Sequence, residues 1–503
     1  MAEFQLAARK AEGETLLLRD SGQYPLCGRG DINLYAVFAE IGRLRLSANG
    51  RMGMVLPSGI ATDDTTKFYF QNVVETQSLI SLFDFENKGF FSGVDSRYKF
   101  CLFTVGSGRK PPMGRKENAT AEFVFFAHSV DDLDDKERRF TLSSNEIALL
   151  NPNTLTCPIF RSQRDAAITL SVHKNHKVLL HENKISPDDH RIRVTRMFDM
   201  NKQRDLFKTA DELLAEGLRF VDGYYIGNNS KYVRLIEGKT FTSYDHRFAI
   251  PGVRAEGGIR TGTATELTES QHETPSYLVQ TVLYLEEQKL NEWANGRLTR
   301  KYVLAFMNIT SATNHRTSVC TILPDVATDY SVRIIIPAKQ DALHMACLAG
   351  LFNSFAFDYL ARQKLQGLNF SDYITYQLAV PSKTILIANS EFLISRVLEL
   401  TYTAFDLKDF AQDCGFDGPP FCWDKSRRFQ LRCELDAIFF HIYGIIRKDV
   451  EYIMETFPIV KRKDEAKYGS YRTKNTILDI YEDLAEAQRS GQTYISKLDP
   501  APR

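Results

Sequence analysis

Hydrophobic and polar positions in the first third of the chain alternate between helical and strand spacing. Helical spacing first appears in the apolar set Leu34, Val37, Phe38, Ile41 and Leu44. Asp31 stands in an N-cap position before this set and Asn49-Gly50 follows it, which predicts one amphipathic helix. The apolar run 52–56, bounded by Gly50 and by Pro57-Ser58-Gly59, is typical of a buried strand. A second helix is predicted after residues 63–65 and a second strand at 79–85.

The order helix, strand, helix, strand predicts part of a doubly wound α/β sheet. Two further strands, at 98–105 and 122–126, follow with no helix between them, so we expect the sheet to end in an antiparallel edge. A sheet of this kind normally has about five to seven strands with both faces covered. Only about 30 residues precede the first predicted helix, so we expect the second half of such a sheet, with the first half outside this chain.

The alternation stops near residue 130. The charged run 131–138 is a candidate domain boundary. Residues 220–385 mix short strands with one long predicted helix at 341–363, which indicates a separate α+β domain. The C-terminal part is predicted to be helical, with breaks at Gly444 and Pro458. We therefore divide the chain into an α/β half-sheet (1–130), a basic connector (131–219), an α+β domain (220–434) and a helical C-terminal segment (435–503).

Composition adds mainly exclusions. The 503 residues are 43% hydrophobic and 25% charged, which is typical of a soluble folded protein and excludes collagenous, coiled-coil and disordered classes. Lys and Arg (63) balance Asp and Glu (63), so any nucleic-acid binding needs a local basic patch. The eight cysteines form no Cys-x-x-Cys pair, and no run approaches the ~18 apolar residues of a membrane span. We therefore expect a cytoplasmic protein with reduced thiols and no membrane anchor.

One stretch of the chain is clearly basic. Residues 161–204 contain ten Lys and Arg against five Asp and Glu, with four interleaved histidines. Two interpretations stay open, an exposed solvated surface and a face that contacts phosphates. His173, His176 and His181 lack a Cys or carboxylate at matching spacing, so we expect a basic loop there and no metal site.

Two loops superficially resemble catalytic motifs. Gly28-Arg29-Gly30 precedes a helix but follows no strand, so it is a poor candidate for a phosphate or cofactor loop. The segment 417–421 (DGPPF) resembles the Asn/Asp-Pro-Pro-aromatic loop of amino-methyltransferases, but Gly418 stands at the acceptor position. Glycine has no side-chain oxygen to accept a hydrogen bond from the target amine, so we do not assign catalysis to this loop.

The order of several segments nevertheless resembles the Eco57I-like family of adenine-N6 DNA methyltransferases. In the first region the similar segments are GRGDINLYAVFAE (28–40), GRMGMVLPSGI (50–60), LFDFEN (82–87) and FSGVDSRYKF (91–100). Segments of the predicted α+β domain are similar to the target-recognition half of these restriction-modification proteins. They are residues 232–237, 244–248, 306–313 with 316–317, and 353–359. Residues 435–481 look like the usual C-terminus of the family.

This resemblance implies a Rossmann-like class I methyltransferase sheet followed by a DNA-recognition domain. It also implies methyl transfer from S-adenosylmethionine to an adenine flipped out of double-stranded DNA. The family's glycine-rich methyl-donor loop and its Asn-Pro-Pro-aromatic loop are both absent from the sequence. We therefore expect part of a methyltransferase of a restriction-modification or phage-defence system, inactive alone and completed by an upstream polypeptide. A non-catalytic DNA-recognition subunit, or a decayed fragment, is the alternative.

The same resemblance assigns candidate residues. Phe91 is the candidate for the wall of the flipped-base pocket, with a strand-end core residue as the alternative. The candidate DNA contacts are Arg97 and Lys99 near that pocket, Lys174, Lys177, Arg191 and Arg193 in the basic stretch, and Arg247, Arg300 and Arg316 in the second domain. Arginine is the usual reader of guanine edges and phosphates, but each of these residues could equally be structural.

Overall fold

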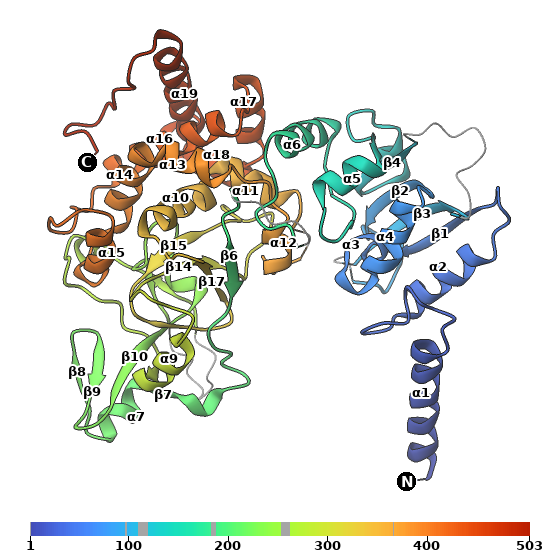
Figure 1. Cartoon of the computed structure of the whole chain (residues 1–503), viewed down its shortest axis with the longest axis horizontal. Helices are drawn as coiled ribbons and strands as arrows, with labels where there is room; N and C mark the ends of the chain where they lie inside the picture. The colour runs from blue at the N-terminus through green and yellow to red at the C-terminus, as the bar shows by residue number, and fades with distance from the viewer. Residues whose placement is uncertain are drawn as a thin grey trace. The chain divides into compact units, whose positions relative to one another are not determined.

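The computed structural model describes residues 2–95, 98–108, 119–182, 188–252, 262–365 and 367–502. It is a mixed α/β structure with several sheets and a helical C-terminal region (Figure 1). The chain forms two compact units. Unit 1 comprises Met1–Asn175 with His181–Asn183, and unit 2 comprises His176–Leu180 with Lys184–Arg503.

Unit 1 is built on a five-stranded sheet. Its strands are β1 (Arg51–Pro57), β2 (Leu79–Glu86), β3 (Lys99–Gly106), β4 (Thr120–Ala127) and β5 (Phe140–Ser143), in the order β1-β3-β2-β4-β5. Strand β3 runs antiparallel to both β1 and β2, so β1 and β2 point the same way with a reversed strand between them. Strand β4 is parallel to β2, and β5 closes the far edge antiparallel to β4. Strand β1 forms the other edge of the sheet.

The strands predicted at 52–56, 79–85 and 98–105 are confirmed as β1, β2 and β3. The prediction that 122–126 belongs to an antiparallel edge was wrong, because β4 pairs in parallel with β2. Since β3 occupies the space between β1 and β2, only the opposite side of β2 is left for β4. The antiparallel edge is formed one strand later, by β5.

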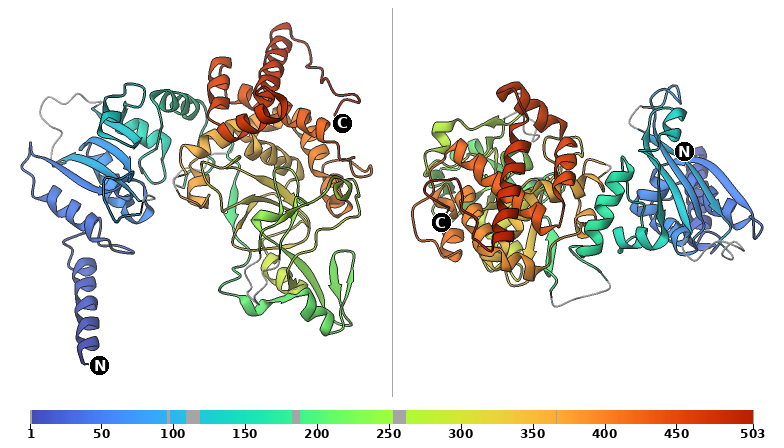
Figure 2. Two further views of the ribbon diagram at one scale, coloured as in Figure 1. Left: turned by 180° about the vertical axis from the view of Figure 1, so that it is seen from behind. Right: turned by 90° about the horizontal axis from the view of Figure 1, so that it is seen from above.

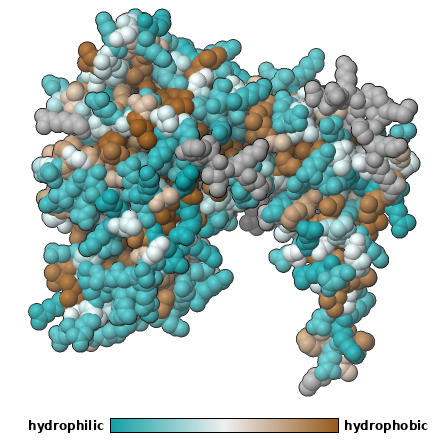
Figure 3. Space-filling model, in the orientation of Figure 1, coloured by the Kyte–Doolittle hydropathy of each residue, from teal (hydrophilic) through white to brown (hydrophobic). Residues whose placement is uncertain are grey.

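Unit 1 also contains six helices among its described residues. They are α1 (Ala2–Asp20), α2 (Leu34–Leu44), α3 (Gly59–Thr62), α4 (Lys67–Glu75), α5 (Ser144–Leu150) and α6 (Gln163–Asn175). The predicted helix after Asp31 is α2. The core packs Phe70 of α4 against Phe103 of β3, with Phe123 of β4 in the same cluster. Helix α1, which the pattern did not predict, buries none of its residues. Apolar residues (brown) therefore appear on its surface in Figure 3.

The compact part of unit 1 continues beyond the boundary expected at residue 130. Strand β5 extends the sheet, and α5 packs against both β5 and α6. Ser143 caps α5 by accepting a hydrogen bond from the Glu146 amide at 3.3 Å, while the Glu146 carboxylate accepts from the Ser143 amide at 2.8 Å. This reciprocal capping box fixes the turn from strand to helix.

Unit 2 contains two larger sheets. One has the order β15-β14-β17-β6, with every pair antiparallel, and β6 at its edge. The other has the order β7-β13-β10-β9-β8, with β16 pairing parallel to β10. The strands are β6 (Ile192–Thr195), β7 (Phe207–Thr209), β8 (Arg219–Val221), β9 (Tyr224–Ile226), β10 (Lys231–Ile236), β13 (Leu283–Glu286), β14 (Val303–Met307), β15 (Cys320–Leu323), β16 (Ala327–Thr328) and β17 (Val332–Pro337), with a separate pair β11 (Ala249–Ile250) and β12 (Thr265–Glu266).

The helices of residues 342–490 gather on one side of unit 2, coloured orange to red in Figures 1 and 2. The helices of unit 2 are α7 (Ala210–Ala215), α8 (Glu269–His272), α9 (Glu287–Ala294), α10 (Ala342–Asn353), α11 (Phe355–Arg362), α12 (Asp372–Tyr376), α13 (Lys383–Ala388), α14 (Ser390–Thr401), α15 (Lys408–Asp413), α16 (Lys425–Ile442), α17 (Arg447–Glu455), α18 (Pro458–Tyr468) and α19 (Arg472–Ser490). No helix among the described residues is both long and apolar enough to cross a membrane.

The prediction of a single helix over 341–363 was wrong, because the structure has two helices there, α10 and α11. Ser354 leaves helical geometry, with φ −72° and ψ 148°, and its hydroxyl accepts a hydrogen bond from the Phe357 amide at 3.2 Å to start α11. An N-cap of this kind ends one helix and begins the next. The predicted C-terminal breaks are confirmed, because Gly444 has φ 68° and α18 begins at Pro458.

Candidate nucleic-acid-binding surfaces

The carboxyl ends of β1 and β2 lie at one edge of the unit 1 sheet, where open α/β sheets usually bind ligands. Ser58 follows β1, and its hydroxyl donates a short hydrogen bond to Asp84 of β2. The other Asp84 oxygen accepts from the Phe126 amide at 3.2 Å. Phe126 has a left-handed φ of 58°, which is uncommon for an aromatic residue. Burial raises the pKa of Asp84, although the Ser58 hydrogen bond opposes this effect.

The loop after β2 is fixed by one buried asparagine. The Asn87 Oδ1 atom accepts a hydrogen bond from the Phe91 amide at 2.9 Å. Its Nδ2 donates to the carbonyl oxygens of Phe91 at 3.2 Å and of Val94 at 2.9 Å. Phe91 itself is 46% exposed and meets Phe100 edge-to-face, with ring centroids 5.0 Å apart. The hydrogen bonds of Asn87 therefore fix a loop at the carboxyl end of β2 that carries Phe91 half exposed beside Phe90, which is 39% exposed.

The cations beside this loop are already engaged. Lys99 is partly buried, with its Nζ 4.2 Å from the centroid of the Phe126 ring and 4.0 Å from Glu86. Arg161 lies over the same ring at 4.0 Å. Burial lowers the pKa of Lys99, and the neighbouring Asp84 and Glu86 oppose that shift. Arg97, the other candidate here, lies outside the described residues.

A second surface lies along the edge strand β6 in unit 2. Arg191 precedes this strand and Arg193 lies within it, opposite Ile336 of β17. Both arginines are exposed. Neither has an ion-pair partner among the residues that the structure describes. The sheet edge therefore carries two positive charges that are free to contact an anion.

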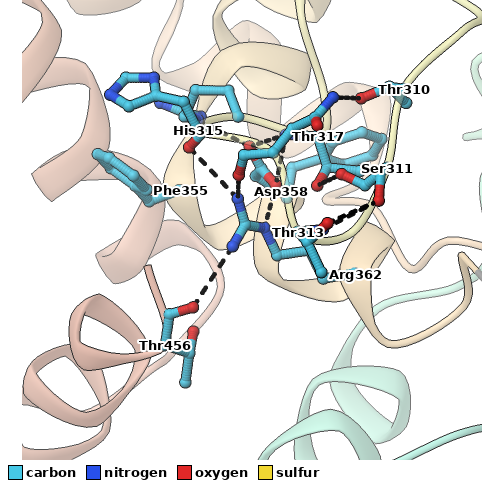
Figure 4. Close-up of polar contacts among 12 residues, drawn as sticks. Thr310, Ser311, Thr313, His315, Thr317, Phe355, Asp358, Arg362 and Thr456 are labelled. Carbon is cyan, nitrogen blue, oxygen red and sulfur yellow. Dashed lines mark hydrogen bonds and ion pairs between the residues drawn. The ribbon is translucent and has the colours of Figure 1, made fainter. Parts of the chain in front are cut away.

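The end of the same sheet carries a loop rich in hydroxyl and amide groups, residues 308–317. Arg362 supports it by donating to the carbonyl oxygens of Asn314 at 2.6 Å and His315 at 3.3 Å (Figure 4). The buried carboxylate of Asp358 accepts from Arg362 Nε at 3.0 Å and from Arg316 Nε at 2.7 Å. This buried cluster holds the loop so that Thr313 and Asn314 remain exposed.

The remaining candidate arginines of the second domain have structural contacts. Arg247 is fully buried, and its guanidinium donates to the carbonyl oxygens of His272, Thr274, Tyr277 and Thr403 at 2.9–3.0 Å. Arg316 binds Asp358 and the carbonyl oxygen of Asn353. Arg300 pairs with Asp413 at 3.0 Å. For Arg247 and Arg316 the structural alternative fits these contacts, whereas Arg300 is exposed enough to remain a candidate.

The two lysines of the basic stretch belong to different units. Lys174 is exposed at the end of α6 in unit 1, and Lys177 is exposed in unit 2. The stretch 161–204 is therefore divided between the units, and its unit 2 part contains Lys177, Arg191 and Arg193. Their contact with DNA stays a prediction.

The solved structures to which the chain is similar include two restriction enzymes and one protein–DNA complex. The chain aligns with the Type IIL restriction-modification enzyme MmeI in complex with DNA at 11% identity and TM-score 0.43, over 89% of this chain and 55% of MmeI. It aligns with the Type IIG restriction endonuclease BpuSI at 13% identity and TM-score 0.28, over 87% of this chain and 52% of BpuSI. For the DrdV–DNA complex the identity is 9% and the TM-score is 0.30, and the alignment covers 72% of this chain and 39% of DrdV.

The chain thus spans about half the length of the first two enzymes. No protein-family model matches it, and no curated protein does. All three TM-scores lie below 0.5, so we base the function on the geometry of this chain itself.

Sequence reasoning did not assign three residues on which these surfaces depend: Asn87, Asp358 and Arg362. Asn87 and Asp358 lie within segments that resemble the methyltransferase family, but nothing in the local pattern distinguishes a clamp from any other polar residue. Asp358 and Arg362 are four residues apart in a predicted helix, which indicates an ion pair. Their contact with residues 314–316 joins segments more than 40 positions apart, and only the fold reveals it.

Proposed function

We propose that the chain is part of a site-specific DNA adenine-N6 methyltransferase of a restriction-modification or phage-defence system. In this proposal unit 1 is the second half of the methyltransferase sheet, and unit 2 recognises DNA. A second polypeptide segment supplies the methyl-donor loop and the Asn-Pro-Pro-aromatic loop.

The main support is the loop fixed by Asn87. A flipped base needs an apolar wall to stack against or to meet edge-on, close to the carboxyl ends of parallel strands. Phe91 is half exposed at that position, and its backbone makes two hydrogen bonds with the Asn87 side chain, which also donates to the Val94 carbonyl oxygen in the same loop. A core residue at a strand end would be buried, and its backbone would not require these hydrogen bonds from Asn87. In our proposal Phe91 forms one wall of the base pocket.

The edge strand β1 supports the need for a second segment. Its outer side has no strand partner among the described residues, although β1 and β2 run parallel as they would within a doubly wound sheet. Nearby on α2, Leu34, Phe38 and Leu44 are exposed. Covering more than ~1,000 Å² of such surface would make a stable interface, at ~25 cal/mol per Å² of apolar area.

The described residues at the carboxyl ends of β1 and β2 do not by themselves fit S-adenosylmethionine. Both Asp84 oxygens already accept hydrogen bonds, from Ser58 and from the Phe126 amide. The Asn87 amide is likewise used within its own loop. Few polar atoms are left to hold a ribose or an amino acid. We therefore expect no binding of S-adenosylmethionine to the isolated chain by calorimetry, and a saturable one-to-one titration in the micromolar range would contradict the need for a second segment.

The decisive experiment adds the polypeptide encoded upstream, provided that it carries the two missing motifs. Co-purification and transfer of methyl groups to adenine would support the proposal. In the complex, Phe91→Ala should lower turnover on duplex DNA more than on DNA with a mismatched target adenine, because a poorly paired base costs less to flip. Phe90→Ala is the comparison variant, since Phe90 is also partly exposed but packs edge-on against two rings, Phe85 and Phe100, and its backbone is not bound by Asn87 in the hydrogen bonds described above. It should affect both substrates equally.

A non-catalytic DNA-recognition subunit is the second candidate, favoured by the unpaired arginines beside β6. It predicts sequence-specific DNA binding by the chain alone and no methylation with any partner. Failure of the two polypeptides to associate would favour this candidate, whereas equal losses on both substrates for Phe91→Ala would show that Phe91 supports the fold and does not hold the flipped base.

A further inference from the structure

A cleft of about 280 Å³ opens in unit 2 where β6 and β17 meet the start of α10 and α13. Basic side chains outnumber acidic ones in its lining. The residues are Asp189, His190, Arg191, Pro337, Ala338, Lys339, His344 and Lys383. Three of these side chains carry a permanent positive charge, and one is acidic. In a chain whose total charge is zero, this is a concentrated positive site.

The three cations have no anionic partner of their own. No ion pair joins Arg191, Lys339 or Lys383 to a carboxylate within the described parts of the chain. The nearby carboxylate of Asp188 is used differently, because it accepts from the amide and the hydroxyl of Thr384 at 3.0 and 2.6 Å. Most other buried or half-buried cations in unit 2 are paired or bound to carbonyl oxygens.

The backbone around the cleft is held in an unusual conformation. Arg191 has a left-handed φ of 46°, and its carbonyl oxygen accepts from the Ala338 amide at 2.9 Å. Such a conformation is unfavourable for a non-glycine residue and is found preferentially at functional sites. It brings Arg191 beside the turn that carries Lys339.

Two buried histidines form a rigid side of the cleft. The His190 Nε2 atom lies 2.8 Å from the Pro381 carbonyl oxygen, which can only accept, so Nε2 carries the proton. His190 Nδ1 then accepts from His344 Nε2 at 2.9 Å. Burial lowers the pKa of both rings, and that of His344 to about 3, where His190 and Lys383 add to the effect. Both rings are therefore neutral near pH 7, and the positive charge comes from the three cations.

We propose that this cleft binds one phosphate group through Arg191, Lys339 and Lys383. Guanidinium and ammonium groups are the usual protein ligands of phosphate oxygens, the first as a planar fork and the second as a point charge. The volume admits one such group with its water molecules. The phosphate is either part of a DNA backbone, which rests on the function proposed above, or belongs to a free phosphate compound, which does not.

The experiment compares three forms of the full chain. Lys339→Gln with Lys383→Gln removes two charges from the cleft, and Lys408→Gln with Lys463→Gln removes two exposed charges elsewhere as the control. Arg191→Gly is a second test variant, because glycine adopts the left-handed conformation without strain. Two readouts are used. One is the thermal shift with inorganic phosphate against chloride at constant ionic strength, and the other is duplex DNA binding measured over a range of salt concentrations.

If the DNA backbone is the ligand, the cleft variants should bind duplex about tenfold more weakly at 0.1 M salt, with the slope of log K against log salt reduced by ~0.9. If a free phosphate compound is the ligand, inorganic phosphate should stabilise the wild type saturably and the cleft variants not at all, with unchanged DNA binding. The proposal is overturned if the cleft variants match the control in both readouts.

Discussion

Unit 2 contains two sets of arginines that a sequence cannot tell apart. Arg247, Arg316 and Arg362 lie inside the fold and bind carbonyl oxygens and Asp358. Arg191 and Arg193 lie on an edge strand without a charged partner among the described residues. The first set holds loops together, and the second is available to a ligand. The difference is one of burial and partners, so the buried set should control stability and the exposed set should control binding.

The largest expected effect is on stability and comes from Arg247→Met. This change leaves four carbonyl oxygens without their donor, two of them buried, which should lower the free energy of unfolding by about 3–5 kcal/mol. Denaturation with urea, followed in the transition of unit 2, measures it. The salt dependence of DNA binding by the protein that remains folded should be unchanged. A loss below 1 kcal/mol would show that water replaces the guanidinium and that the two sets differ less than we infer.

The exposed arginines, together with two exposed lysines of the basic stretch, should affect DNA binding and leave the stability nearly unchanged. Changing Lys174, Lys177, Arg191 and Arg193 together to Glu should weaken duplex binding at least about hundredfold at 0.1 M salt, because each lost phosphate contact removes ~0.9 from the salt slope. The free energy of unfolding should change by less than about 1 kcal/mol, since all four side chains are exposed. A mobility-shift assay and the same urea titration test both parts. Unchanged affinity would mean that the basic stretch is only a solvated surface.

A buried carboxyl near Arg316 should also make the stability of the fold depend on pH. Asp436 accepts a hydrogen bond from the Phe355 amide at 2.7 Å, and burial raises its pKa to about 7 despite the opposing charge of Arg316. The folded state therefore holds this proton more tightly than the unfolded state, whose carboxyl titrates near ~4. Stability should fall as the pH rises from about 4 to 7 and then level off.

Asp436→Asn should reduce this decline by about 1–3 kcal/mol between pH 5 and 8, and the part due to Asp329, whose pKa burial also raises to about 7, should remain. Urea denaturation of both proteins across this range measures it. Parallel pH profiles for the two proteins would contradict the prediction. DNA binding offers the contrast, because the exposed arginines do not titrate in this range.

Arg300 is the intermediate case and should give the smallest effect. It is exposed but paired with Asp413, which also accepts from the Tyr302 hydroxyl at 2.6 Å. Arg300→Ala should cost less than about 1 kcal/mol, the usual value of an exposed ion pair. We expect less than a twofold change in DNA affinity by fluorescence anisotropy. A tenfold loss would place Arg300 with the ligand-binding set.

Local pattern was sufficient for the strands β1 to β4 and for the breaks between the C-terminal helices. Residues 52–56 and 79–85 are continuous apolar runs between turn residues, and this signal does not depend on the rest of the fold. Helix α1 was missed because its apolar residues do not form one consistent stripe, and the helix buries none of them. The break at Ser354 was missed because the apolar pattern continues through it.

The candidate sites were harder to predict, for a physical reason. A sequence shows which residues carry charge but not which of them are already neutralised by distant segments. The partners of Arg247 lie 25 to 156 positions away, and the cleft joins Arg191 to Lys383 across a similar distance. The resemblance to a methyltransferase family located the aromatic loop at Phe91, but the clamp by Asn87 that makes it rigid needed coordinates.

Strand β1 has a practical consequence for handling the protein. An edge strand with unpaired backbone groups is a template for pairing with another copy, and Val55 adds an exposed apolar side chain to this one. Arg51 at its start, Gly53 within it and Pro57 at its end are residues of the kind that discourage such pairing. Self-association of the purified chain should therefore be weak, should grow with concentration, and should be relieved by Val55→Lys.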